Sequence, residues 1–469
     1  MSSKIKILFL NPPGNKIFIR DYYCSKVSKA YYLPQPVDLL IQTSFFSKEK
    51  YELKVLDCIA DKISIEKAHS LSKEFEPDFI IGLLASVSLK QDVPFYTQLR
   101  ALIPKTKILV SGDAVLEDYD SVFGNWKWLD VVIFNFFNGG AKKWIENDFE
   151  NASGIVIRNG DSFLKKAEVR RSVLELETPR HDLFSARKYR MPFANALPMA
   201  TVLTNYACPY PCTFCIMSTM PYMSRSANSI INELITLKKL GYRYIYFSDQ
   251  TFFQSKAITR ELLNWMVTSN YDISWMCFSR VDVLNEDEIN LMKKAGCNLV
   301  MFGVEWADEK YLEEYKKSYT LNQVRATFDL TAKAGIKRLG TFLIGVPGQG
   351  RQSIIDTVEF AKEIKADYAS FNVAVPRSNT SFREKAIEAG IINESVKVMD
   401  QSGDEVTMGT GELSREELQE IKNWAYRSFY FRPIYILKRI VGISNWVELR
   451  MHIQEAFYIL KGLFKRSAG

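Results

Sequence analysis

The chain carries the segment Cys208-Pro-Tyr-Pro-Cys212-Thr-Phe-Cys215 directly after the apolar run Met199-Ala-Thr-Val-Leu-Thr-Asn205. Three of the seven cysteines in 469 residues therefore lie on one short loop behind a strand. Three thiolates so spaced can hold three irons of a cubane cluster and leave the fourth iron open to a small molecule. Structural zinc needs four nitrogen or sulfur ligands, and the nearest histidine, His181, lies far upstream. We predict that Cys208, Cys212 and Cys215 ligate a 4Fe–4S cluster.

The Cys-x3-Cys-x2-Cys spacing, with Phe214 just before the last cysteine, resembles the signature of the radical S-adenosylmethionine (SAM) enzymes. This resemblance implies that the open iron binds SAM and that one electron cleaves SAM to a 5′-deoxyadenosyl radical. The electron implies an external one-electron reductant of the flavodoxin or ferredoxin type. Phe214 is carried over as a residue of the cofactor site.

The bulk composition is that of a globular chain, with 47% hydrophobic and 25% charged residues. The net charge of +7 is modest and the lysines are scattered, so no nucleic-acid partner is expected. No segment reaches the roughly 18 apolar residues of a membrane span, and the first apolar run is too short for a signal peptide. We expect a cytoplasmic protein, because a reducing compartment suits a cluster held by thiolates. The isolated Cys24, Cys58, Cys277 and Cys297 are expected to be buried thiols.

Residues 1–150 alternate short apolar runs with helix-like stretches, which predicts a Rossmann-like, doubly wound parallel sheet. The expected strands are Ile5–Leu10, Leu53–Asp57, Phe79–Leu84, Lys107–Ser111 and Asp130–Phe134, and the expected helices are Pro36–Lys48, Ile65–Glu76 and Pro94–Leu102. Ligands of such sheets bind beyond the carboxyl ends of the strands. Those ends carry Asn11, Pro12, Ser86, Ser111 and Gly112, which could contact a large planar ligand or be ordinary loop residues.

This domain order resembles the cobalamin-binding radical SAM enzymes, as do Asn11-Pro-Pro, Pro34-Gln-Pro36, Glu76-Pro-Asp and Ser111-Gly-Asp. The resemblance implies cobalamin as a cofactor, with the five strand-end residues as its contacts. The domain departs from the family in two places. Its one histidine, His69, is not part of an Asp-x-His-x-x-Gly motif, which implies cobalamin without a histidine on cobalt. Phe134-Asn-Phe-Phe-Asn138 replaces the family's Gly-Glu pair.

Residues 151–198 are predicted to be a connector with a hairpin at Asn159-Gly160, and His181 is expected in a surface loop. Residues 199–376 show six strand–helix repeats, which suit a partial (β/α)6 barrel of the TIM type. The expected strands are Met199–Asn205, Tyr244–Ser248, Ile273–Ser279, Leu299–Val304, Leu339–Ile344 and Tyr368–Val373. Helices are expected to end at Gly241, Gly296, Gly335 and Gly390.

The carboxyl ends of these strands form the rim that carries the chemistry in such barrels. From SAM's charged groups and the family resemblance, we expect Asp249 or Gln250 to bind its ammonium and Arg280 its carboxylate. Glu305 is expected at the ribose or ammonium, and Gly345 and Pro347 near the adenine. An ordinary salt bridge is the alternative for each charged residue. Lys317 resembles a family lysine, and a solvated helix face is equally compatible with its sequence.

Residues 377–469 are predicted to be helical, over Arg383–Ala389, Ser414–Phe431, Pro433–Val441 and Trp446–Leu463. They are rich in aromatic and basic residues. They could cap the substrate, pack on the barrel or rest on anionic lipid.

We interpret the chain as a cobalamin-dependent radical SAM enzyme that transfers a methyl group to an unactivated carbon of a small-molecule or lipid-like substrate. One alternative is a radical SAM cyclase or C–C bond-forming or rearranging enzyme that uses cobalamin without net methylation. Another is a non-catalytic iron–sulfur or zinc-binding interaction module. A tRNA-modifying methylthiotransferase is disfavoured, because the N-terminal region lacks a second cysteine triad.

Overall fold

A computed structural model of the chain describes residues 4–22, 25–28, 31–116, 119–167, 173–377, 379–395, 406–443 and 445–465. The chain divides into two compact units. The first unit is Met1–Ser28 with Leu33–Tyr189, and the second is Lys29–Tyr32 with Arg190–Gly469. Of the four isolated cysteines, Cys58, Cys277 and Cys297 are buried as predicted, and Cys24 lies outside the described residues.

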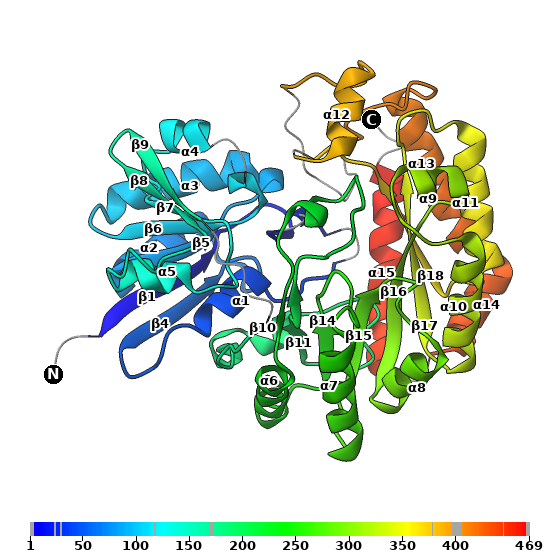
Figure 1. Cartoon of the computed structure of the whole chain (residues 1–469), viewed down its shortest axis with the longest axis horizontal. Helices are drawn as coiled ribbons and strands as arrows, with labels where there is room; N and C mark the ends of the chain where they lie inside the picture. The colour runs from blue at the N-terminus through cyan, green and yellow to red at the C-terminus, as the bar shows by residue number, and fades with distance from the viewer. Residues whose placement is uncertain are drawn as a thin grey trace. The chain divides into compact units, whose positions relative to one another are not determined.

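The first unit is built on a seven-stranded sheet in the order β4-β1-β5-β6-β7-β8-β9 (Figure 1). The strands are β1 (Ile5–Asn11), β4 (Tyr51–Asp57), β5 (Phe79–Leu83), β6 (Lys107–Ser111), β7 (Val131–Ile133), β8 (Ile155–Asn159) and β9 (Ser162–Lys166). The helices are α1 (Val37–Thr43), α2 (Ile65–Phe75), α3 (Leu89–Leu102), α4 (Tyr119–Asn125) and α5 (Gly140–Ile145). The strands from β4 to β7 pair in parallel, so the predicted doubly wound sheet is confirmed. Helix α1 ends five residues before the predicted Lys48, at Thr43.

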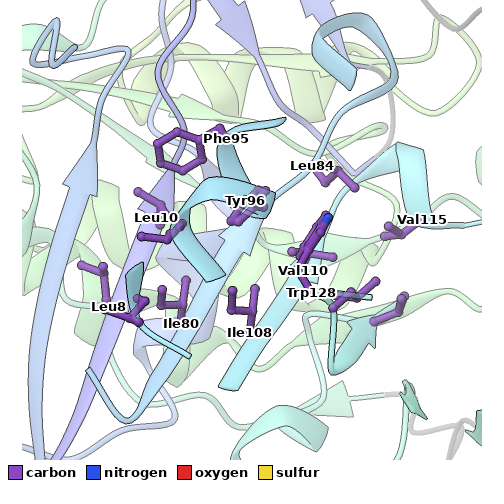
Figure 2. Close-up of a cluster of buried hydrophobic side chains, with 14 of the residues drawn as sticks. Leu8, Leu10, Ile80, Leu84, Phe95, Tyr96, Ile108, Val110, Val115 and Trp128 are labelled. Atoms are coloured by element: carbon purple, nitrogen blue, oxygen red, sulfur yellow. The ribbon is translucent and has the colours of Figure 1, made fainter. Parts of the chain in front are cut away.

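Alternate residues of these strands form one hydrophobic core, which includes Leu8, Leu10, Ile80, Ile108 and Val110 (Figure 2). This alternation follows from the two-residue period of a strand. Tyr96 of α3 closes the core from the helix side. Its ring stacks on Trp128 at 4.8 Å between centroids, and its hydroxyl donates to the Leu83 carbonyl at 3.0 Å.

The predicted hairpin is present as β8 and β9, which meet at the register pair Asn159–Ser162. Gly160 has φ of +60°, as the tight turn requires. Strand β8 pairs antiparallel with β7, so the hairpin extends the sheet of the first unit. The chain stays with this unit as far as Tyr189, whose hydroxyl donates to Asp57 at 2.9 Å. The expectation of a surface position for His181 is wrong, since its side chain is buried.

The second unit holds six parallel strands in the order β11-β14-β15-β16-β17-β18 (Figure 1). These are β11 (Met199–Val202), β14 (Tyr244–Phe247), β15 (Ser274–Ser279), β16 (Cys297–Glu305), β17 (Lys337–Ile344) and β18 (Tyr368–Val373). The helices between them are α6 (Ala227–Lys239), α7 (Lys256–Thr268), α8 (Glu286–Lys294), α9 (Glu309–Glu314), α10 (Leu321–Lys333) and α11 (Arg351–Glu363). The predicted partial barrel is confirmed. The four predicted terminal glycines all have positive φ.

The C-terminal helices are α12 (Ser381–Glu388), α13 (Arg415–Tyr430), α14 (Pro433–Val441) and α15 (Trp446–Lys465). Helix α13 covers the edge strand β18. Tyr426 donates to the Phe371 carbonyl at 3.1 Å and Tyr430 to the Ala369 carbonyl at 2.7 Å. Phenol groups thus satisfy backbone atoms that an edge strand would leave open. Of the three predictions for this region, packing on the barrel is confirmed for α13.

Candidate functional site

The three-cysteine loop begins and ends in a pair of short strands. Strands β12 (Asn205–Tyr206) and β13 (Met223–Arg225) pair antiparallel, and residues 207–222 form the excursion between them. Cys212 is buried, whereas Cys208 and Cys215 are half-buried. The loop therefore keeps its three thiols on one segment at the carboxyl end of β11, as the sequence predicts.

Asp249 holds the start of this loop. The side chain is fully buried and accepts from the Thr204 amide at 2.7 Å, the Thr204 hydroxyl at 2.8 Å and the Asn205 amide at 2.9 Å. Burial raises the pKa of Asp249 to about 7, although these hydrogen bonds act in the opposite direction. Both carboxylate oxygens already have protein donors, which indicates a positioning role.

A buried ion pair supports the same pair of strands from its second strand. The Arg225 guanidinium binds the Glu233 carboxylate, and both side chains are inaccessible to solvent. Arg225 also donates to the Leu203 carbonyl at 3.0 Å, two residues before β12. Sequence patterns gave no signal for this pair, because a lone arginine and a helical glutamate are normally solvated.

Arg280 follows the carboxyl end of β15 and lies against the cysteine loop. Its Nη1 is 3.6 Å from the Cys212 sulfur, and its guanidinium lies 3.7 Å from the centroid of the Tyr210 ring. Asp282 fixes the guanidinium with two hydrogen bonds, at 2.9 and 2.8 Å, and the Lys317 carbonyl accepts a further one. The arginine is thus held in place by protein groups and donates toward a cysteine sulfur.

Glu305 and Lys317 form a second charged pair near Cys212. The Lys317 ammonium lies 3.0 Å from a Glu305 oxygen, and both side chains are largely buried. Burial alone would lower the pKa of Lys317, but Glu305 raises it above its usual value. The solvated alternative for Lys317 is therefore wrong. Gly303 makes room, since a Cβ there would lie 2.8 Å from the Glu305 carboxylate.

Phe214 and the turn after β17, which contains Gly345 and Pro347, are the remaining parts of the predicted SAM site. The Phe214 ring packs edge-on against Trp306 with 5.6 Å between centroids, and the Lys317 ammonium lies 5.7 Å from its centroid. Gly345 has φ of +84°, and a Cβ there would lie 2.5 Å from Leu418 of α13. Gln250 and Pro347 are half-buried.

The structure thus brings Arg280 and Glu305 near the cysteine loop, to which Phe214 itself belongs. Sequence reasoning missed Tyr210, Asp282 and the burial of Lys317; the Arg-x-Asp spacing of 280–282 was the one available signal. Among the described residues, no group of three His, Cys, Asp or Glu side chains is arranged to hold a single metal ion. In a cubane each thiolate binds a different iron, so the ligands need not surround one point.

In the first unit, the predicted cobalamin contacts take part in a buried network. Arg20 donates to the Asn11 side chain and the Pro12 carbonyl, each at 2.9 Å, and forms an ion pair with Asp92 at 2.7 Å. Asn11 also donates to Asp57 at 2.8 Å. The Asn11 side chain and the Pro12 carbonyl are therefore already bonded to protein groups.

Ser111, Gly112 and Ser86 lie at the ends of β6 and β5. The Ser111 hydroxyl donates to Asp38 at 3.0 Å, and the Ser86 amide donates to Asp113 at 2.9 Å. Gly112 has φ of +129°, and a Cβ there would lie 2.1 Å from the Leu84 carbonyl oxygen. Asp38 is fully buried, and burial followed by the charge of Asp21 raises its pKa well above the ordinary value.

Two acceptors at this end of the sheet have no hydrogen-bond partner in the described part of the chain. They are Oδ1 of Asp38 and Oε1 of Gln42, both buried on α1. The amide of Gln42 donates to the Phe136 carbonyl at 2.8 Å, beyond the end of β7. His69 instead bonds the Phe95 carbonyl at 3.2 Å and stacks on the Phe95 ring, which is a structural role.

The chain was compared with protein families and with proteins of known sequence. Residues 202–361 match the model of the radical SAM superfamily. The chain is 28% identical to an uncharacterized methyltransferase of Pyrococcus horikoshii, over 86% of this chain and 89% of that protein.

Two solved structures are similar to the chain. One is the radical SAM methyltransferase TsrM of Kitasatospora setae with cobalamin and a 4Fe–4S cluster bound, at TM-score 0.67 and 14% identity over 100% of both chains. The other is the cobalamin-dependent SAM radical enzyme OxsB with aqua-cobalamin and SAM bound, at TM-score 0.69 and 13% identity over 98% of this chain and 72% of that one. At these identities the likeness shows the fold.

Proposed function

We propose that this chain, which carries a radical SAM domain at residues 202–361, is a cobalamin-dependent enzyme that methylates an unactivated carbon. The observation that supports this most is the cysteine loop, held at the carboxyl end of the first barrel strand by Asp249 and Arg225. The relative of 28% identity, named a methyltransferase, covers most of the chain and favours methyl transfer over ring formation.

Cys208, Cys212 and Cys215 fit a 4Fe–4S cluster with one open iron. When bound, the cluster and SAM supply a 5′-deoxyadenosyl radical, and cobalamin supplies the methyl group for transfer. The protein holds the loop rigidly, because Asp249 fixes its first strand and Arg280 contacts Cys212. Rigid placement matters because radical transfer depends on close, fixed distances between reacting atoms.

The buried charges divide into two roles in this proposal. Arg280 acts on the cluster through the Cys212 sulfur, which its Nη1 contacts, while its Nε and Nη2 donate to Asp282 and the Lys317 carbonyl. Glu305 is the better candidate to bind SAM. One of its oxygens is held by Lys317 at 3.0 Å, and carboxylates are strong acceptors for ammonium and ribose hydroxyl groups.

Cobalamin fits the first unit through two acceptors to which the described residues donate no hydrogen bond. The corrin rim of cobalamin carries amide groups, which donate hydrogen bonds. Oδ1 of Asp38 and Oε1 of Gln42 are buried acceptors at the strand ends and suit such donors. Asn11 and Pro12, by contrast, serve to hold Arg20. We therefore assign cobalamin contacts to α1 in addition to Ser86, Ser111 and Gly112.

The proposed reaction needs a one-electron donor of the flavodoxin or ferredoxin type and a small-molecule substrate. A reducing cytoplasm would keep the three cysteines as thiols before the cluster is assembled.

The test is anaerobic reconstitution of the full chain with iron, sulfide and hydroxocobalamin, followed by visible spectroscopy and assay of 5′-deoxyadenosine with a chemical reductant. We expect cluster and corrinoid absorption together, and 5′-deoxyadenosine that depends on reductant. Asp38→Ala should reduce the bound corrinoid and leave the iron content unchanged. A protein that holds zinc and no iron would contradict the proposal, and one that holds iron but no corrinoid would limit it to SAM chemistry.

A further inference from the structure

Helix α14 turns its apolar residues toward solvent. Ile434, Leu437, Ile440 and Val441 are between 61% and 77% exposed. Their three- and four-residue spacing puts them on one side of the helix, so they form a continuous stripe. No residue of α14 is buried. A surface helix of a globular protein normally turns such a stripe toward the core.

The opposite side of α14 holds the helix to the barrel through polar groups. The Tyr435 hydroxyl donates to the Asp367 carbonyl at 2.9 Å. The Arg439 guanidinium, one turn further on, lies 3.9 Å from the centroid of the Tyr368 ring and bonds His452 of α15 at 3.1 Å. The outward direction of the apolar stripe is therefore fixed by contacts on the other face.

The charge of the surrounding segment has one sign. Residues 421–447 contain no aspartate or glutamate. Their cations are Lys422, which is buried, and Arg427, Arg432, Lys438 and Arg439. Lys438 is exposed, beside Leu437 of the stripe. Trp446, 75% exposed at the start of α15, adds an amphipathic ring of the type enriched at membrane–water interfaces.

We propose that α14 docks this protein on a lipid bilayer surface that contains anionic phospholipid. An apolar stripe bordered by cations, on a helix too short to span a membrane, suits the boundary between headgroups and acyl chains. No helix in the described part of the chain is long and apolar enough to cross a membrane, so the contact would be peripheral. Residues 421–447 carry cations and no acidic residue, which favours an anionic lipid surface over a second copy of this chain, whose matching helix would carry the same charges.

The docking face lies away from the cysteine loop. Tyr435 bonds Asp367, which precedes β18, whereas the cysteine loop follows the carboxyl end of β11 in the same parallel sheet. The proposed contact would therefore leave the strand carboxyl ends uncovered. It acts as an anchor that is separate from the chemistry.

The experiment is flotation of the full-length protein with vesicles of phosphatidylcholine alone and of phosphatidylcholine with phosphatidylglycerol. We expect binding to the second kind that is at least tenfold stronger and that weakens with salt. Ile434→Glu should lower this binding at least tenfold. The matched control is Ile65→Glu, an exposed isoleucine in the first turn of α2, and it should bind as wild type. Lys438→Gln should weaken binding about fivefold, the effect of one cation near an anionic surface.

Leu437→Glu repeats the test on the same stripe if Ile434→Glu yields no folded protein. Unchanged binding by a folded stripe variant, or no vesicle binding by wild type, would overturn the proposal. Light scattering without vesicles tests for a dimer. A concentration-dependent dimer that dissociates in the Ile434→Glu variant would assign the stripe to a second copy and overturn the lipid assignment.

Discussion

At the scale of single residues, the contact between Arg280 and the Cys212 sulfur gives the site a property beyond ligand binding. Reduction adds negative charge to a cluster, so a nearby guanidinium stabilises the reduced form and raises the reduction potential. The guanidinium is buried and its orientation is fixed by Asp282, so solvent screens it little. Arg280 should therefore tune how readily the cluster accepts an electron.

We predict that Arg280→Ala lowers the cluster's reduction potential by tens of millivolts. About 59 mV corresponds to a tenfold change for one electron, and only a part of the about 1.5–3 kcal/mol of a charge-assisted hydrogen bond depends on the redox state of the cluster. The measurement is an anaerobic redox titration followed by electron paramagnetic resonance. Arg325→Ala, which removes an exposed arginine paired with Glu363, should leave the potential unchanged. A wild-type potential with weakened SAM binding would instead return Arg280 to the carboxylate of SAM.

The three cysteines of the loop lie on one segment, whereas Cys277 and Cys297 are buried thiols of separate strands. We predict that Cys212→Ala abolishes the cluster, because two thiolates cannot hold a cubane with one open iron. Cys277→Ala is the matched control, since Cys277 is a buried thiol of the same unit on β15 and should keep full iron content. Iron and sulfide analysis after reconstitution provides the measurement. Equal iron in the two variants would remove Cys212 from the ligand set.

At the scale of elements, Asp249 couples β14 to the start of the cysteine loop, and its variants should report on that coupling. Asp249→Ala leaves three buried donors on Thr204 and Asn205 without an acceptor, at a cost of about 1–3 kcal/mol each. Asp249→Asn keeps an acceptor and should cost less. We predict that the alanine variant unfolds at lower denaturant and assembles less cluster than the asparagine variant.

The pH dependence of stability distinguishes the carboxyl group itself. Burial raises the pKa of folded Asp249 from 3.8 to about 7, so the folded state keeps a proton that the unfolded state releases in this interval. Its contribution to stability is therefore present at about pH 4 and falls as the pH rises toward 7. Asp249→Asn should flatten this slope in urea unfolding measured at several pH values. An unchanged slope would show that Asp249 titrates near its ordinary pKa.

The sequence predicted elements well where local patterns decide them. Strands such as Tyr368–Val373 and the left-handed helix end at Gly241 follow from apolar runs and glycine signals. The burial of Lys317 did not follow, because Tyr-Lys-Lys-Ser resembles a solvated helix face and its partner Glu305 lies on another element. The Arg280–Cys212 contact arises in the same way, from residues 68 positions apart. The cysteine spacing needed no such tertiary information.

At the scale of the whole molecule, the boundary between the two units differs from the one that the sequence predicts. The sequence predicts a connector over residues 151–198, yet β8 pairs with β7 and Tyr189 bonds Asp57. Hairpin patterns identify the turn but not the strand that the hairpin joins, because that pairing is non-local. The first unit therefore includes residues 151–189, which the sequence pattern predicts to be part of a connector.

This difference predicts how fragments of the chain behave. A protein of residues 1–189 should fold cooperatively, whereas one of residues 1–150 should be less stable by several kcal/mol. The shorter fragment loses Ile155 and Val156, both fully buried, and burial of such side chains contributes about 1.5–3 kcal/mol each. It also exposes the edge of β7, which promotes aggregation. Urea unfolding followed by circular dichroism compares the two, and hydroxocobalamin titration of the longer fragment tests cofactor binding in the same unit. Equal unfolding midpoints would place the boundary at residue 150 and make the β8–β9 hairpin an independent connector.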